Sequence, residues 1–281
     1  MNKIAKVKCV QAWRANAIVK GVLFSASLAL GAASYGQVLN GGFGAAGTPT
    51  NVFITNTGSA TSTVPNWFMG GAQAFERVYS PGCGGGGAGC GSIPLYLAGP
   101  VPATSPAGGN FFVLDADPTF GGSLGPDSIN QYISVLPGQT YALSFWYAAG
   151  QDLGQSGAID AAWQVTLNNV FLPGDGGTLI TPAGGGGPKP TTTLTLSNPS
   201  QGFTGWNFES LTFIAPTPTG YILGSGVASE LLTFLGISPN GGLPPILLLD
   251  GVSVNAVPEP GSLALWCVGL MGMLIGLRRR G

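Results

Sequence analysis

The feature that most constrains the fold is the way glycine and proline interrupt the chain between residues 38 and 256. Short apolar runs alternate there with clusters of these two residues, of which the 281-residue chain has 48 and 22. The clearest run, residues 140–149 (TYALSFWYAA), alternates its side chains as a half-buried strand does. No stretch outside the two ends keeps a helical period. The sequence predicts an all-β domain of about ten strands, arranged as a two-sheet jelly-roll sandwich.

Charge is distributed unevenly along the chain. Five of the ten basic residues precede residue 21 and three follow residue 277, whereas residues 38–257 hold only Arg77 and Lys189 against ten acidic residues. Two minus ten gives this middle segment a formal charge of −8. An acidic domain repels phosphate groups, so the sequence argues against nucleic acid as a partner.

The first 36 residues have the pattern of a secretory signal peptide. A basic segment precedes the apolar run 21–33 (GVLFSASLALGAA), which is too short to cross a bilayer comfortably. Ser34 and Gly36 are small enough to suit cleavage by signal peptidase after Gly36, and cleavage after Ala33 or an uncleaved anchor are the alternatives. We expect the chain to be exported.

The C-terminal segment combines a Pro-Glu-Pro motif, an uncharged apolar run and an arginine cluster. In order, these are Val257, Pro258, Glu259 and Pro260, then residues 261–277, then Arg278, Arg279 and Arg280. The apolar run is near the lower length limit for a transmembrane helix, and the arginines are a stop-transfer signal that stays in the cytoplasm. Prolines cannot continue a helix, so the stretch before the membrane is open to a protease.

This order of motif, helix and arginines resembles the PEP-CTERM sorting domain of Gram-negative bacteria. The resemblance implies processing by an exosortase, a membrane enzyme, with residues 261–277 as a transient inner-membrane anchor. The domain would face outward and then reach the cell surface or extracellular space; a permanent single-pass anchor is the alternative. The chain would thus consist of a signal peptide (1–36), a sandwich domain (37–256) and a sorting segment (257–281).

Four segments of the middle domain resemble galactose-binding-like jelly rolls. They are residues 38–43 (VLNGGF), 109–115 (GNFFVLD), 136–146 (LPGQTYALSFW) and 248–254 (LLDGVSV). The resemblance implies a sandwich like that of carbohydrate-binding modules. Such domains often hold a structural calcium, for which Asn40 and Asp250 are the candidate ligands, but Gly44 and Gly251 replace acids that are common there. Because calcium takes six to eight oxygen ligands, we expect no cofactor and keep calcium as the alternative.

Two cysteines remain in the middle domain, Cys83 and Cys90, and they bracket a glycine-rich loop (GGGGAG). The export compartment is oxidising, so the sequence predicts a Cys83–Cys90 disulfide. A zinc site is a poor alternative, because two cysteines are too few for it and the chain has no histidine.

The residues that could carry chemistry or binding are few. The lack of histidine excludes Ser–His–Asp and Cys–His catalysis. Asp115 and Asp117 lie two apart, so in a strand their carboxylates would share a face and could act as an acid–base pair; the alternative is a solvated strand end with Asp117 in a turn. Trp146 and Trp163 are candidates for stacking on sugar rings, with burial in the core as the alternative.

Three functions are compatible with these features. We expect an exported surface or matrix protein without catalytic activity that associates with exopolysaccharide. The first alternative is a specific carbohydrate-binding module, which differs in having a defined sugar site. The second is a polysaccharide hydrolase that uses Asp115 and Asp117.

Overall fold

The structure, a computed structural model, describes part of the compact unit that spans Gly36–Gly281. The described residues are 37–46, 48, 50, 64–70, 76–81, 104–116, 127–151, 154–171, 191–215, 227–238, 245–258 and 269. The signal peptide, both cysteines, Asp117 and all of the sorting segment except Val257, Pro258 and Gly269 lie outside these residues. Within the described part of the chain, no helix has the length and apolar character needed to cross a membrane.

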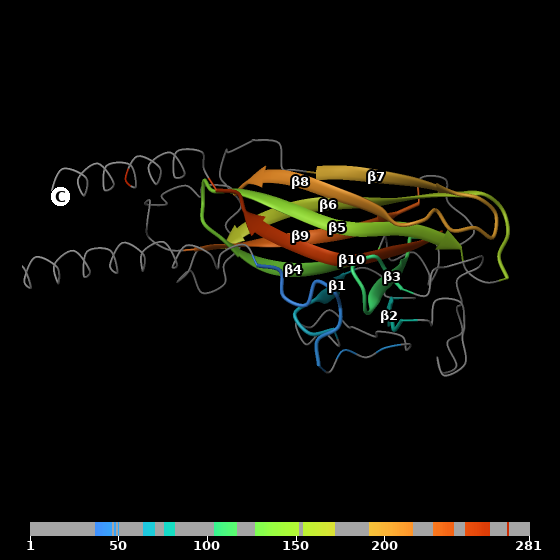
Figure 1. The fold of residues 1–281 in the computed structure, drawn as a ribbon. Coiled ribbons are helices and arrows are strands. Elements are labelled where there is room, and N and C mark those ends of the chain that lie inside the picture. Colours follow the sequence, from blue (N-terminus) through green and yellow to red (C-terminus); the bar gives the residue numbers. More distant parts are fainter. Residues whose placement is uncertain are drawn as a thin grey trace, which may run out of the picture. The chain divides into compact units, whose positions relative to one another are not determined.

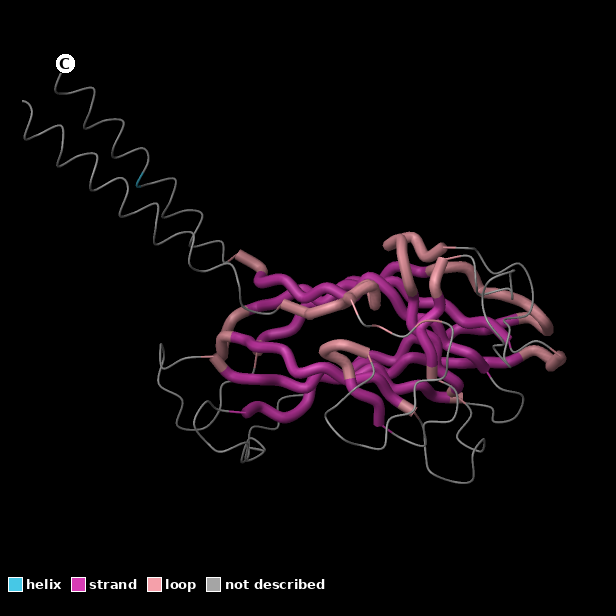
Figure 2. Tube along the Cα trace, turned by 90° about the horizontal axis from the view of Figure 1, so that it is seen from below, coloured by secondary structure: helices cyan, strands magenta, loops and turns pink. Residues whose placement is uncertain are grey.

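In the described residues, ten strands form two antiparallel five-stranded sheets (Figure 1). The β9 sheet has the order β1 (Phe68–Gly70), β4 (Ser128–Val135), β9 (Ala228–Ile237), β6 (Ile159–Phe171) and β7 (Thr191–Asn198). The β10 sheet has the order β2 (Arg77–Tyr79), β3 (Phe111–Asp115), β10 (Pro245–Ala256), β5 (Thr140–Gln151) and β8 (Asn207–Ile214). Figure 2 shows the domain from below, with the strands in magenta making up most of its described residues. The predicted all-β two-sheet sandwich is confirmed.

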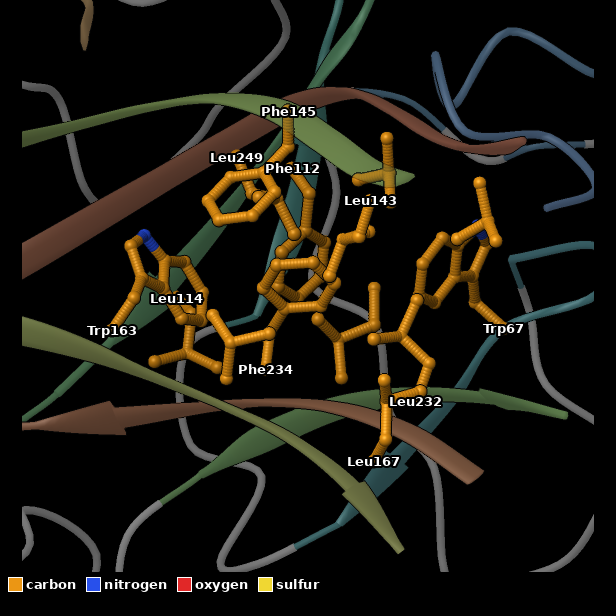
Figure 3. Close-up of a cluster of buried hydrophobic side chains, with 14 of the residues drawn as sticks. Trp67, Phe112, Leu114, Leu143, Phe145, Trp163, Leu167, Leu232, Phe234 and Leu249 are labelled. Atoms are coloured by element: carbon orange, nitrogen blue, oxygen red, sulfur yellow. The ribbon is translucent and has the colours of Figure 1, made fainter. Parts of the chain in front are cut away.

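The main core lies between the two sheets and is built by side-chain alternation. Successive strand residues point to opposite faces, and every second residue of β9, from Ala228 to Gly236, is buried. Phe234 lies at the centre of this core, with its ring 5.0 Å from that of Phe145 and 6.1 Å from that of Trp163. Figure 3 shows Trp67 and Trp163 on either side of it. Contacts from both sheets to one ring fix how the sheets face each other.

The segment before β1 packs against the sandwich through backbone hydrogen bonds. The buried Gln131 side chain accepts from the Leu39 N–H at 2.7 Å and donates to the carbonyls of Leu39 (2.8 Å) and Asn66 (3.0 Å). The Val252 N–H donates to the Gly41 carbonyl at 3.1 Å. Residues 38–43, whose sequence resembles the opening strand of galactose-binding-like jelly rolls, form a turn here and not a strand, with Asn40 at φ 56°.

Candidate functional site

The outer face of the β10 sheet carries an ordered set of side chains on β10, β5 and β8, all of them exposed or half-exposed except Asp250. Leu143 and Phe145 of β5 point into the core, so Ser144 and Trp146 point outward. Register pairs then define three rows across the three strands. They are Asp250–Trp146–Phe208, Ser253–Ser144–Ser210 and Asn255–Ala142–Thr212. We call these residues the β5 face.

An aromatic pair forms the first row of the β5 face. The rings of Trp146 and Phe208 lie 5.1 Å apart at 55°, and Phe208 is 55% exposed. Gly251 lies beside this pair with φ +60°, and a Cβ there would be 3.2 Å from Trp146 Cδ1 and 2.7 Å from the Ala107 Cβ. Glycine at this position therefore leaves room for the indole. Large exposed aromatic surface of this kind is typical of a binding surface.

Hydroxyl and amide groups form the next two rows. Ser210, Thr212 and Asn255 are exposed, and the Asn255 Nδ2 donates to Ser253 Oγ at 2.8 Å. Each hydroxyl both donates and accepts hydrogen bonds. Asp250 is the one charged residue in the three rows, and it has no exposed surface. The β5 face therefore offers the Trp146–Phe208 pair, called the aromatic shelf below, beside uncharged hydrogen-bonding groups.

A second apolar cluster bounds the β5 face. Trp206 precedes β8, and its ring meets that of Phe111 at 5.7 Å and that of Phe203 at 6.3 Å, both edge-on. Phe203 and Trp206 pack against a buried apolar patch on β2, β3, β5 and β10, to which Phe111 belongs. The segment around Phe203 is held by Thr204, whose N–H donates to the Ala149 carbonyl at 3.0 Å and whose Oγ1 accepts from the Ala149 N–H at 2.9 Å. Trp206 thus covers part of this buried patch.

Asn40 and Asp250, the candidate calcium ligands, each use one side-chain oxygen in a hydrogen bond to the backbone. The Asn40 Oδ1 accepts from the Ala45 N–H at 2.8 Å and its Nδ2 donates to the Pro65 carbonyl at 3.1 Å, so its amide closes a turn. Asp250 Oδ1 accepts from the Gly251 N–H at 2.7 Å, and burial raises the pKa of Asp250 to about 6. Among the described residues, no group of three or more His, Cys, Asp and Glu is arranged to hold a metal ion.

The structure does not support a sugar-stacking role for Trp163. Its side chain has no exposed surface, and its Nε1 donates to the Leu248 carbonyl at 3.2 Å in the core. Asp115 is 3% exposed at the end of β3, so its carboxylate is not open to a polymer. Its predicted partner, Asp117, lies outside the described residues. Of the predicted binding residues, Trp146 alone lies on an accessible face of the described structure.

Two buried acids and one exposed aromatic escaped the sequence analysis. Glu76 has no exposed surface, and its pKa rises to about 8 through burial and the nearby Asp127. Glu230 is 1% exposed, and burial raises its pKa to about 7. Phe208 was missed as the partner of Trp146. Side-chain alternation could have identified these residues. Glu230 shares its strand face with the apolar Leu232, which indicates burial, and Phe208 shares its face with the polar Ser210, which indicates exposure.

The sorting segment begins where the sandwich ends. Strand β10 ends at Ala256, and Val257 is held to the sandwich by its N–H, which donates to the Thr140 carbonyl at 2.8 Å, and by its carbonyl, which accepts from Gln139 Nε2 at 2.9 Å. Pro258 is exposed. Residues 256–280 match the PEP-CTERM protein-sorting motif. The chain therefore carries the tag of exported proteins that an exosortase-type enzyme processes.

Solved structures include distant β-sandwich neighbours. A structure of TmCBM61 in complex with beta-1,4-galactotriose is 13% identical, covers 80% of this chain and 100% of its own, and has a TM-score of 0.37. A cyclase from Fischerella sp. TAU is 15% identical, with coverage of 81% and 99% and a TM-score of 0.43. A CBM4 structure is 15% identical, with coverage of 65% and 87% and a TM-score of 0.28. No curated protein matches the chain.

Proposed function

We propose that this protein is an exported, non-catalytic binding protein that holds a neutral polysaccharide on the β5 face. The observation that carries the proposal is the Trp146–Phe208 pair beside a row of three serines in register. A pyranose ring presents an apolar C–H surface and a rim of hydroxyl groups. The aromatic shelf suits the first, and the serine row suits the second.

Charge favours a neutral polymer over an acidic one. The middle segment has a formal charge of −8, and the three rows of the β5 face contain no Lys or Arg. An anionic glycan would meet repulsion without a compensating cation. The chain would bind neutral exopolysaccharide at the cell surface or outside the cell, where its sorting motif directs it.

Burial of the acids supports a binding role without hydrolysis. Glycoside hydrolysis uses two carboxyl groups that flank the scissile bond. Asp115, Glu76 and Glu230 are exposed by 3%, 0% and 1%. None of these three carboxyl groups is open to a polymer, whereas the aromatic pair of the β5 face is.

Trp146→Ala is expected to weaken polysaccharide binding by about tenfold or more, because a central aromatic side chain contributes strongly to binding. The measurement is affinity electrophoresis of the detergent-solubilised full chain in gels that contain galactan, xylan or glucomannan. Alginate serves as the anionic comparison and is expected not to retard the protein. Ile214→Ala is the matched control, because Ile214 is 67% exposed on the same strand as Phe208 but lies outside the three rows.

Two results would contradict the proposal. One is the absence of retardation by all three neutral polysaccharides. The other is equal retardation of the wild-type chain and the Trp146→Ala variant, since binding would then take place elsewhere. Unchanged thermal unfolding of the variant is needed alongside, to show that the loss comes from the shelf.

A further inference from the structure

We infer that the opposite face of the sandwich is a second binding surface for neutral polysaccharide, so that one domain bridges two glycan chains. This inference rests on the proposed function and extends it from holding a chain to cross-linking chains. The second surface is the outer face of the β9 sheet. We call it the β4 face, after the strand that carries its exposed aromatic residue, Tyr132.

An aromatic pair marks the β4 face as it marks the β5 face. The rings of Phe68 and Tyr132 stack 5.4 Å apart at 29°, and Tyr132 is 51% exposed. Four large apolar or aromatic residues of the described structure are strongly exposed, and they are Leu39, Tyr132, Phe208 and Ile214. Tyr132 and Phe208 are the two aromatic members of this set, and they lie on different sheets.

Uncharged hydrogen-bonding side chains continue from the aromatic pair across the sheet. Asn130 pairs in register with Phe68 on one side and with Thr233 on the other, and Thr233 pairs with Thr166. Thr233 Oγ1 donates to Asn130 Oδ1 at 2.7 Å. Asn130 is itself only 5% exposed and its amide bonds to protein groups, so it positions Thr233 rather than meeting a ligand. Thr233 and Thr166 are half-exposed, and because neighbouring strands lie about 4.8 Å apart, a glycan chain that crosses β9 and β6 there meets a hydroxyl from each.

The edge strand of the same sheet extends this polar surface. Thr193, Thr195 and Ser197 of β7 are exposed, and Gln164 of β6, the register partner of Thr193, is half-exposed. Asp160 is the one charged residue in the described strands of this sheet that alternation directs outward. A hydroxyl-rich surface with little charge and a stacked aromatic pair fits the same neutral polymer class as the β5 face.

The two faces point away from each other because their inner sides share one core. Phe145 of β5 and Phe234 of β9 meet at 5.0 Å in the centre of the sandwich. One straight glycan segment therefore cannot contact both faces at once. When both faces are occupied, the domain connects two chains or two distant parts of one chain, as a bivalent linker does.

The test measures cross-linking separately from binding. The detergent-solubilised full chain is mixed with galactan, xylan or glucomannan, and light scattering is followed as protein is added. The wild-type chain is expected to raise the scattering of a polysaccharide that it binds. Tyr132→Ala and Trp146→Ala are each expected to be retarded less than the wild type in electrophoresis, because only one face still binds, and to lose the scattering increase. The double variant is expected to lose both the retardation and the scattering increase.

Two controls are needed. One shows that a lost signal comes from the missing aromatic ring and not from unfolding, and the other shows that cross-linking takes place through the two faces and not through self-association of the chain. Tyr132→Phe keeps the ring of a half-exposed side chain, so it is expected to cross-link as the wild type does. If the chain cross-linked by associating through its ends, the single-face variants would cross-link too. Unchanged thermal midpoints would show that each variant is folded.

The outcomes distinguish this inference from the proposed function. If Tyr132→Ala raises the scattering as much as the wild type does, and Trp146→Ala no longer binds at all, the β4 face is not a binding surface and the β5 face remains one. Unchanged binding and scattering with Trp146→Ala would overturn the β5 face and, with it, the bridging role. Failure to bind any of the three polysaccharides would overturn both.

Discussion

Replacing Glu230 with glutamine is expected to raise the free energy of unfolding by about 3 kcal/mol at pH 8 and to change it little at pH 4. Glu230 points into the sandwich from β9, it is 1% exposed, and neither carboxylate oxygen has a hydrogen-bond partner among the described residues. Burial alone raises its pKa from 4.5 to about 7. A charged carboxylate at this site destabilises the fold.

The direction of the pH dependence follows from proton binding. Between pH 4.5 and about pH 7 the folded chain holds a proton on Glu230 that the unfolded chain has lost. Stability therefore falls as the pH rises through this window and is fully present below it. Glu76 acts in the same direction, because burial and Asp127 raise its pKa to about 8. The wild-type domain is expected to be more stable at pH 4.5 than at pH 8 with respect to these groups.

Denaturant unfolding at pH 4, 6 and 8 checks this prediction. Glu209→Gln is the matched control, because it makes the same chemical change at a glutamate that is partly exposed on β8. A Glu230→Gln variant with the same stability as the wild type at pH 8 would show that the carboxylate is solvated or paired in solution.

Gly41→Ala is expected to destabilise the domain by about 3 kcal/mol or more, as strong overpacking does. A Cβ on Gly41 would overlap the Val252 carbonyl oxygen and lie 2.9 Å from the carbonyl carbon. Both groups are backbone, so neither can swing aside. The Gly41 carbonyl also accepts the Val252 N–H, and the substitution would break the contact that holds the N-terminal turn to β10.

Gly44→Ala is the matched control for this turn. The atom nearest to a Cβ on Gly44 would be the Gly42 carbonyl oxygen at 3.7 Å, which is an ordinary van der Waals contact. Thermal unfolding of the two variants and the wild type measures the difference. Equal midpoints for Gly41→Ala and Gly44→Ala would mean that the turn does not pack on β10 as the structure has it.

Alternation in the sequence predicted the strands but not which side of each strand is covered. In β5 it placed Tyr141, Leu143 and Phe145 on one face and Trp146 on the other, and both faces carry aromatic rings. The inward choice depends on the second sheet, where Phe234 meets Phe145. Trp163 shares its face with the apolar residues Val165 and Leu167, all of which are buried. That pattern already favoured a core role over sugar stacking.

The sequence predicted only part of the candidate site, for a related reason. Trp146 was identified by residue type, but its partner Phe208 lies 62 positions later and is brought beside it by the β5–β8 register. The serine row likewise joins residues from three strands. Pairing of distant strands is set by the whole sandwich, so local patterns do not reveal it. The turn at 38–43 was missed because its shape depends on contacts with Gln131 and Val252.

The most direct test of the central claim is hydroxyl-radical footprinting of the full chain with and without the neutral polysaccharide of its own host's matrix. Oxidation of Trp146 and Phe208 is expected to fall when polysaccharide is present. Trp67 and Trp163 are internal controls, because both are fully buried and are expected to react little in either condition. Unchanged oxidation of Trp146 and Phe208 at saturating polysaccharide would contradict the claim that the β5 face holds a glycan.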